Sequence, residues 1–361
     1  MNHLIEQIAA HFQTEVEALK LEPIQHGSQQ KHNVCRLKLG SVNYLLKQHD
    51  ITTPVVEAGY IPCEIESTVL SVLHRNGCRV PQIVWKLEAS HTLLLEWCGE
   101  LTLDAMAQSR PLSALTPILR TALMELCRVE TVFAENMELL TPYAFRFDLN
   151  VTLQRLLEQG RKTLGYLCGA MTSSQTAHLD ALWTTFSNRL QTAPPTFDSL
   201  DYQSRNIVIS DDIPFLIDFS SVGWDWQERR LVQFFNSIGA NQEGTNFVSL
   251  LNRELVEAYA GWVAAHRETC SSAEIAARVD SHHLLFYLSV IHRILCAVAQ
   301  PEASESRTLF KAWSDLKARY QSALRQVIHT GLSDGVYTTQ IRQMIANRMT
   351  QPPKSPLSGG L

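Results

Sequence analysis

Residues 201–219 read Asp201-Tyr-Gln-Ser-Arg-Asn206-Ile-Val-Ile-Ser-Asp-Asp-Ile-Pro-Phe-Leu-Ile-Asp218-Phe219. Their hydrophobic pattern predicts two strands, residues 207–210 and 214–219, joined by a turn at Asp211 and Asp212. A hairpin centred on position 212 places Asn206 opposite Asp218, or nearly so. The sequence therefore predicts that a carboxamide and a carboxylate face each other at the base of one hairpin.

Three polar side chains of this segment suit phosphoryl transfer. Amide and carboxylate oxygens are hard ligands of the kind that Mg²⁺ prefers, which makes Asn206 and Asp218 the candidate metal ligands. Asp201 precedes Asn206 on a loop that leads into the same hairpin. We interpret Asp201 as the catalytic residue, which accepts or orients an acceptor hydroxyl while the metal bridges the phosphates. The alternative is an ordinary polar hairpin with acidic turn residues.

The combination of Asp201, Asn206 and the triplet Ile217-Asp218-Phe219 resembles the signature of the aminoglycoside and choline phosphotransferase family, which are protein-kinase-like kinases of small molecules. The string Asp-Tyr-Gln-Ser-Arg-Asn is similar to the variant in the bacterial sugar-kinase branch, which includes N-acetylmuramate/N-acetylglucosamine anomeric kinases. The resemblance covers roughly residues 20–300. It implies an α+β, bilobal protein-kinase-like fold with a small antiparallel β-sheet N-lobe and a large helical C-lobe. It also implies the cofactors ATP and Mg²⁺.

The family pattern requires a strand lysine that grips the nucleotide phosphates and a helix glutamate that holds this lysine. Lys47 ends the predicted strand 42–47, at the place where the family has its lysine. The predicted helix 62–76 offers two glutamates. Glu66 lies on the apolar side of this helix and Glu64 on the polar side, so periodicity favours Glu66.

Two further segments are expected to contact the nucleotide. Gly27 and Ser28 open a segment whose backbone N–H groups would cover the phosphates, although a plain hairpin turn explains the pattern equally well. Residues 93–99 resemble the hinge between the lobes of the family. There the adenine would bond to the backbone at Glu96 and Cys98. A buried strand that ends in a turn predicts the same pattern.

Three positions depart from the family pattern. Ser199 stands where the family usually has a histidine that supports the loop of its catalytic Asp. Arg230 stands near the place of a second supporting Asp, so either Glu228 substitutes for that Asp or the loop is held differently. The Gly27 segment also has a single glycine. These departures keep open an alternative: a catalytically inactive, kinase-like nucleotide-binding regulatory protein.

The sequence pattern divides the chain into two lobes and a tail. Residues 1–97 show strand patterns, at 34–39, 42–47, 80–84 and 92–96, and form the predicted nucleotide-binding lobe with a leading helix. Residues 98–345 form the predicted helical lobe, in which 102–190 and 227–345 are helical by period and a β-rich island at 197–219 holds the catalytic loop and the metal-binding hairpin. Residues 346–361 are rich in Pro, Ser and Gly, which predicts a disordered tail.

The composition argues against several classes of protein. The 361 residues carry 31 Lys and Arg against 36 Asp and Glu, and a net charge of −5 is untypical of nucleic-acid binders. The longest apolar helical stretch, residues 284–299, is interrupted by charged residues and shorter than a membrane span, so we expect no membrane partner. The eight cysteines form no CxxC pair, which predicts reduced, buried thiols in a cytoplasmic protein.

The leading hypothesis is an ATP-dependent phosphotransferase that acts on a hydroxyl group of a small polar metabolite. The resemblance favours a sugar or amino sugar as this acceptor, bound by the helical lobe. Trp224 and Trp226 follow the metal-binding strand and are candidates to stack on a sugar ring, although tryptophans more often serve packing. The oligomeric state does not follow from the sequence.

Overall fold

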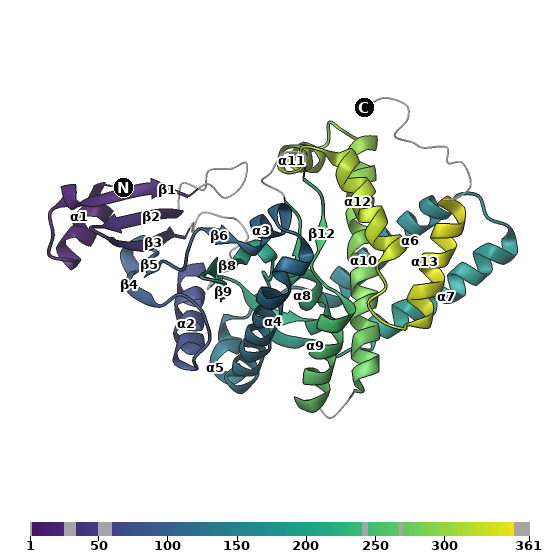
Figure 1. The fold of residues 1–361 in the computed structure, drawn as a ribbon, viewed down its shortest axis with the longest axis horizontal. Coiled ribbons are helices and arrows are strands. Elements are labelled where there is room, and N and C mark those ends of the chain that lie inside the picture. Colours follow the sequence, from purple (N-terminus) through teal and green to yellow (C-terminus); the bar gives the residue numbers. More distant parts are fainter. Residues whose placement is uncertain (1, 25–33, 50–59, 240–244, 267–269, 350–361) are drawn as a thin grey trace.

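The amino-terminal part of the chain forms a five-stranded antiparallel sheet at one end of the molecule (Figure 1). The computed structural model describes residues 2–24, 34–49, 60–239, 245–266 and 270–349. Across the sheet the strands lie in the order β1 Leu19–Pro23, β2 Val34–Leu39, β3 Val42–Gln48, β5 Thr92–Glu96 and β4 Ile83–Leu87. The predicted strands at 34–39, 42–47 and 92–96 are confirmed.

Two helices cover this sheet, and their sequences explain why they form. Helix α2, Pro62–Arg75, begins with proline in its first turn and is followed by Gly77, whose φ of +76° suits glycine beyond a helix end. This confirms the predicted helix at 62–76. Helix α1, Asn2–His11, buries Leu4 and Ile8 in a small cluster with residues of the sheet. Its apolar stripe therefore anchors the amino terminus.

The helical lobe is built around one long central helix, α10 (Figure 1). It packs against α6, α8, α9 and α12, and helices α4 and α9 pack together on the side nearer the sheet. The helices of this lobe are α3 Leu103–Ser109, α4 Leu112–Glu135, α5 Met137–Leu140, α6 Leu149–Cys168, α7 Ser173–Gln191, α8 Gln227–Phe234, α9 Arg253–His266, α10 Ser272–Ala299, α11 Ser304–Ala312, α12 Leu316–His329 and α13 Val336–Met349. The predicted helical character of this lobe is confirmed.

Short strands connect the sheet to the helical lobe, and the hairpin of the sequence signature lies between the two (Figure 1). A three-stranded sheet has the order β6, β8, β9, while β7 pairs with β10 and β11 pairs with β12. The bounds are β6 Leu101–Thr102, β7 Thr196–Ser199, β8 Ile207–Ser210, β9 Ile213–Leu216, β10 Val222–Asp225, β11 Asn236–Ser237 and β12 Val248–Ser249. The predicted β-rich island is thus present, but it is made of two separate ribbons.

The register of the signature hairpin differs from the predicted one. Ile207 pairs with Leu216, so the hairpin is centred between Asp211 and Asp212 rather than on position 212. Both turn residues have positive φ, +49° and +61°, as in the tight two-residue turns whose twist matches that of the strands. Strand β9 ends at Leu216, and the predicted extension to position 219 is wrong. The backbone N–H of Ile217, the residue before Asp218, consequently donates to the carbonyl of Asn206. Asp218 itself is one position beyond this pair.

Other predicted boundaries also need correction. The strand predicted at 80–84 is β4, Ile83–Leu87, so the prediction began three residues too early and ended three residues too early. The helix α13 continues to Met349, past the predicted boundary at 345, and positions 350–361 lie outside the described residues. All eight cysteines are free, as predicted, but Cys296 is exposed rather than buried.

Helix α10 is long enough and apolar enough to cross a membrane by length and composition. It begins at Ser272, earlier than the apolar stretch predicted at 284–299. In its most apolar window 61% of the residues are buried inside the protein, as in the core helix of a helical lobe. The same test is passed by core helices of soluble proteins, so it gives weak support to a membrane span.

The tight contact between helices α6 and α10 gives a stability prediction. A Cβ atom at Gly160 would lie 2.8 Å from Trp183 and 2.9 Å from Leu285, closer than packed atoms approach. We expect Gly160→Ala to lower the free energy of unfolding by about 1–3 kcal/mol in urea titrations. Gly165→Ala on the same helix meets only the flexible end of Arg161 at 3.4 Å, and should raise stability by up to about 1 kcal/mol. Equal effects of the two substitutions would contradict this packing argument.

Candidate active site

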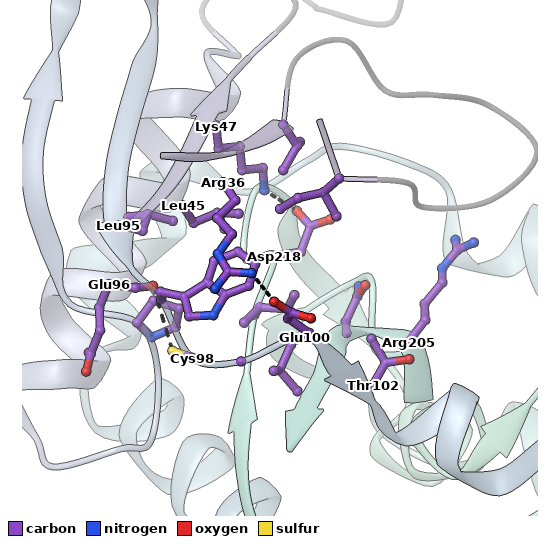
Figure 2. Close-up of a pocket in the computed structure, with 18 of the residues that line it drawn as sticks. Arg36, Leu45, Lys47, Leu95, Glu96, Cys98, Glu100, Thr102, Arg205 and Asp218 are labelled. Carbon is purple, nitrogen blue, oxygen red and sulfur yellow. Dashed lines mark hydrogen bonds and ion pairs between the residues drawn. The ribbon is translucent and has the colours of Figure 1, made fainter. Parts of the chain in front are cut away.

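A cavity of about 390 Å³ lies between the sheet and the helical lobe (Figure 2). Strands β2, β3 and β5 form one side of it, and the loop and hairpin of residues 201–218 form the other. Every predicted site residue that the structure describes lines this cavity: Lys47, Glu66, Glu96, Cys98, Asp201, Asn206 and Asp218. Gly27 and Ser28 lie outside the described residues, so their predicted contact with the phosphates stays a prediction.

Lys47 connects the two lobes at the inner end of the cavity. Its Nζ atom lies 2.9 Å from Oε1 of Glu66 and 2.7 Å from Oδ1 of Asp218, which it faces in Figure 2. Burial lowers the pKa of Lys47, but the charges of Asp218 and Glu66 more than offset this and hold the pKa above its ordinary value. Lys47 is therefore a fixed positive charge, held between one residue of each lobe.

The structure separates the two glutamates of α2 as periodicity predicted. Glu66 is buried, with 1% of its surface exposed, and contacts Lys47. Glu64 faces away and pairs with Lys86 at 2.5 Å. The sequence analysis missed His49, whose Nε2 lies 2.8 Å from Oε2 of Glu66. The sequence does contain a signal for His49. In an extended chain, side chains two positions apart point to the same side, so His49 lies on the same side as Lys47.

Asp218 has a backbone conformation that residues other than glycine rarely adopt. Its φ is +67°, a conformation that costs of the order of 1–3 kcal/mol and persists only where the surroundings enforce it. Lys47 and the hydroxyl of Ser220, at 3.0 Å, both donate to Oδ1, and the neighbouring Phe219 is buried in the core. Burial and the charge of Asp218 raise the pKa of nearby Tyr60 to about 12. These contacts hold the carboxylate toward the cavity.

The loop before the hairpin brings Asp201 and Asn206 together. The side-chain amide of Asn206 donates to the carbonyl oxygen of Asp201 at 2.9 Å and to its Oδ2 at 3.3 Å. Gln203 donates to the other carboxylate oxygen of Asp201. Since the amide nitrogen of Asn206 is engaged, its amide oxygen is the atom suited to a metal. Asp201, Asn206 and Asp218 thus line one cavity, and Asn206 lies one position from direct opposition to Asp218, which is the nearly opposite arrangement that the sequence predicts.

The segment predicted as the hinge runs along the mouth of the cavity. The N–H of Glu96 donates to the carbonyl of Gln82 at 2.8 Å, so its carbonyl group is the one suited to a ligand. Burial raises the pKa of the Cys98 thiol to about 12, so the thiol stays neutral beside the cavity. Gly99 has a φ of +126°, and an added Cβ would lie 3.2 Å from the carbonyl of Ile209. This glycine lets the hinge pass close to the hairpin.

A charged pair at the cavity mouth was not predicted. Arg36 of β2 pairs with Glu100 and lies 4.8 Å from the ring centre of Trp97 (Figure 2). It also donates to Asn43 at 3.0 Å. The sequence places Arg36 on a strand, but Trp97 and Glu100 lie about sixty residues later in the chain. Their proximity to Arg36 follows only from the packing of β2 beside the hinge. The pair closes part of the cavity mouth.

The departures from the family pattern have structural outcomes. Glu228 pairs with Arg278 of α10 at 2.8 Å and so does not substitute for the missing Asp beside the loop. Arg230 is completely buried next to that loop. Ser199 accepts the N–H of Asp201 at 3.5 Å, which is a weak bond. The loop is therefore held differently, as the second alternative of the sequence analysis stated.

The two candidate sugar-stacking tryptophans occupy different environments. Trp226 is buried, and its indole N–H donates to the carbonyl of Ala193 at 2.9 Å, which assigns it to packing. Trp224 is 38% exposed and packs edge-to-face against Phe197, with ring centres 5.7 Å apart. Trp226 therefore cannot stack on a ligand, whereas Trp224 is partly exposed but is not among the residues that line the cavity.

Comparison with known proteins adds information on the fold. No protein-family model and no curated protein matches the sequence. Among solved structures, a choline/ethanolamine kinase family protein from Mesorhizobium loti has a TM-score of 0.51 at 13% identity, over 96% of this chain and 99% of that chain. The GDP complex of wild-type aminoglycoside 2'-phosphotransferase-IIIa has a TM-score of 0.51 at 14% identity, over 86% and 96%.

A choline kinase from Cryptosporidium parvum gives a similar result, with a TM-score of 0.50 at 10% identity over 97% of this chain and 96% of that chain. None of these three is a sugar kinase, so the narrower resemblance to the sugar-kinase branch stays a prediction. Sequence identities of 10–14% establish a similarity of fold. The chain has the mixed α/β, two-lobed kinase-like fold of these small-molecule kinases.

Proposed function

We propose that this protein is an ATP-dependent phosphotransferase that phosphorylates a hydroxyl group of a small polar molecule. One observation carries the proposal: Lys47, Asp201, Asn206 and Asp218 come from distant parts of the chain and line one cavity. The order of these groups in the sequence and their placement between two lobes match the requirements of phosphoryl transfer. An ordinary polar hairpin would not explain why Lys47 of the sheet meets Asp218.

The cavity fits a nucleotide. Leu45, Val208 and Ile217 supply apolar walls, and the backbone at Glu96 and Cys98 offers hydrogen-bonding groups for a purine. Lys47 lies at the inner end, where its charge would bind phosphate oxygens in place of the carboxylate of Asp218. A nucleotide that enters with its base at the hinge thus reaches Lys47 with its phosphates.

The cavity also fits Mg²⁺ in the manner usual for kinases. Within the described residues no group of three or more His, Cys, Asp or Glu side chains could hold a metal alone. Magnesium in such sites is bound by one or two carboxylates together with substrate phosphates, so this finding agrees with a metal that arrives with ATP. Asp218 and the amide oxygen of Asn206 are the protein ligands that we assign to it.

The chemistry that follows from this arrangement is mainly positioning. Mg-ATP supplies the phosphoryl group and charge compensation when it is bound. Asp201 would orient the acceptor hydroxyl and accept its proton, Lys47 would hold the phosphates, and Glu66 would fix Lys47. The transition state of such transfers is loose, so correct placement of the reacting oxygen accounts for much of the catalysis.

The acceptor that we propose is a sugar or amino sugar. The string of residues 201–206 supports it, because that string is similar to the one in the sugar-kinase branch of the family that the sequence resembles. The similar structures are described as choline, ethanolamine and aminoglycoside kinases, so amino alcohols and aminoglycosides are the competing acceptors. All three classes carry a hydroxyl group beside polar or cationic groups.

A phosphorylation assay with γ-labelled ATP tests the proposal. Sugars, amino sugars, amino alcohols and aminoglycosides form the panel of acceptors. We expect transfer of label to at least one sugar or amino sugar and none in EDTA. Transfer to amino alcohols alone would keep the kinase and reject the sugar. Thermal-shift measurements with Mg-ATP, with ATP in EDTA and with buffer show whether the nucleotide binds and needs the metal.

The competing function is a kinase-like nucleotide-binding regulator without catalysis, and Ser199 is the observation that favours it. Its bond to the N–H of Asp201 is long, and a histidine would support the loop more firmly. Stabilisation by Mg-ATP without transfer to any acceptor of the panel would support this alternative. No stabilisation by ATP under either condition would reject both functions.

A further inference from the structure

The loop that carries Asp201 is flanked by buried charged groups whose role the proposed function does not explain. Asp198 lies at the end of β7, three residues before Asp201, and Tyr202 directly follows Asp201. Arg230 reaches the same place from helix α8. The three side chains are almost completely buried, with exposed fractions of 1%, 4% and 0%. Burial of two opposite charges is costly, so their retention calls for a reason.

Arg230 ties the two strands below the loop together. Its Nη2 donates to the carbonyl of Thr196 at 2.6 Å and to the carbonyl of Asp225 at 2.8 Å, which are paired residues of β7 and β10. Its Nη1 lies 3.4 Å from Oδ2 of Asp198. Burial lowers the pKa of Arg230, but the charges of Asp198, Asp225 and Glu130 raise this pKa by more than burial lowers it. The guanidinium therefore stays charged.

Asp198 connects Arg230 to the loop that carries Asp201. Its Oδ1 accepts the N–H of Ser199 at 2.6 Å and the hydroxyl of Tyr202 at 2.8 Å. The ring of Tyr202 packs edge-to-face on Phe234 of α8, with centres 5.6 Å apart. The backbone is thus fixed on both sides of Asp201, through Ser199 before it and Tyr202 after it. The weak bond that the N–H of Asp201 donates to Ser199 Oγ is not what holds this loop.

We propose that Asp198, Tyr202 and Arg230 form a positioning unit that holds the Asp201 loop in its reactive geometry. This inference rests on the proposed function. In the family that the sequence resembles, a helix Asp supports this loop. Here the helix residue is Arg230, and the carboxylate is that of Asp198 on the strand before the loop, so the positive and negative charges have exchanged places. The three residues act through Asp201, because they are not among the residues that line the cavity. They compensate for Ser199, and the protein need not be inactive because of it.

Tyr202→Phe is the most informative variant, because it keeps the ring and removes only the bond to Asp198. Tyr259→Phe is its matched control. The hydroxyl of Tyr259 also donates to a buried carboxylate, that of Glu130, at 2.8 and 2.9 Å, but Tyr259 lies on α9 outside the catalytic loop. Each substitution removes one buried hydroxyl that donates to a carboxylate and leaves that carboxylate in place, Asp198 in the first variant and Glu130 in the second.

We expect kcat of Tyr202→Phe to fall about tenfold or more, with KM for ATP changed less than about twofold, because misplacement of the reacting group acts on the transition state. The assay uses the acceptor found in the panel, or ATP hydrolysis without an acceptor. In Tyr259→Phe both constants should stay within about twofold of the parent, although both variants lose thermal stability. A merely structural role would lower stability alike and leave kcat per folded molecule unchanged.

Amide hydrogen exchange of residues 199–207 gives a readout that does not depend on activity. Exchange should become faster in Tyr202→Phe and stay unchanged in Tyr259→Phe. If the parent protein transfers no phosphate, the proposed function fails, and the exchange comparison alone decides whether Tyr202 anchors the loop. Equal loss of kcat in both variants, unchanged kcat in Tyr202→Phe, or equal exchange in both would overturn the positioning unit.

Discussion

Asp201→Asn should abolish turnover and leave nucleotide binding intact. The carboxylate of Asp201 lines the cavity beside Asn206 and is the group assigned to the acceptor hydroxyl. An asparagine keeps the shape of the side chain but cannot accept a proton, and it retains only one of the two oxygens that accept from Gln203 and Asn206. We expect kcat to fall by about 10²–10⁴-fold, the usual contribution of a positioned acid or base. Stabilisation by Mg-ATP in a thermal-shift assay should remain, because Lys47 and Asp218 are unchanged.

The hairpin offers a matched control for this substitution. Asp211 lies in the exposed turn of the same hairpin, so Asp211→Asn makes the same chemical change away from the cavity. Asparagine tolerates the positive φ of +49° at this position, so the control adds no backbone strain. Its kcat should equal that of the parent. Turnover of Asp201→Asn at the parent rate with the same acceptor would show that Asp201 has no chemical role.

Local patterns predicted the parts of the site that depend on one element. Period in α2 placed Glu66 inside and Glu64 outside, and the structure has both as expected. The position of Lys47 on its strand also brought it to the cavity. In each case the residue and the face that it occupies are set by the repeat of a helix or strand, which a single sequence shows directly.

The sequence could not predict features that arise where distant segments meet. The hairpin register depended on whether the turn has two residues or three, and the predicted centre was displaced by half a residue. The Arg36–Glu100 pair and the Asp198–Arg230 pair each join residues more than thirty positions apart. Arg230 was recognised only as a departure from a pattern, because its partner is defined by the packing of α8 against β7.

Asp218→Ala should weaken the binding of Mg-ATP itself, unlike Asp201→Asn. Asp218 is the carboxylate assigned to the metal, and it also accepts a bond from Lys47 at 2.7 Å. Without it, the affinity for Mg-ATP should fall at least about tenfold, or ~1.4 kcal/mol, in calorimetric titrations. The affinity for ATP in EDTA should change less, because Lys47 keeps Glu66 as its partner and the hinge is untouched. The dependence of binding on Mg²⁺ should therefore largely disappear.

Alanine at position 218 would also carry the strain of a φ of +67°, and this effect has to be separated from the loss of the carboxylate. Asp212 provides the comparison, since its φ is +61° and its side chain is exposed in the hairpin turn. Asp212→Ala should lose similar stability yet bind Mg-ATP like the parent. If both variants bound Mg-ATP equally, backbone strain would account for the change and Asp218 would not be the metal ligand. A loss confined to Asp218→Ala, and confined to solutions with Mg²⁺, would assign the metal to this carboxylate, since the lost bonds from Lys47 and Ser220 would alter the binding of ATP in EDTA as well.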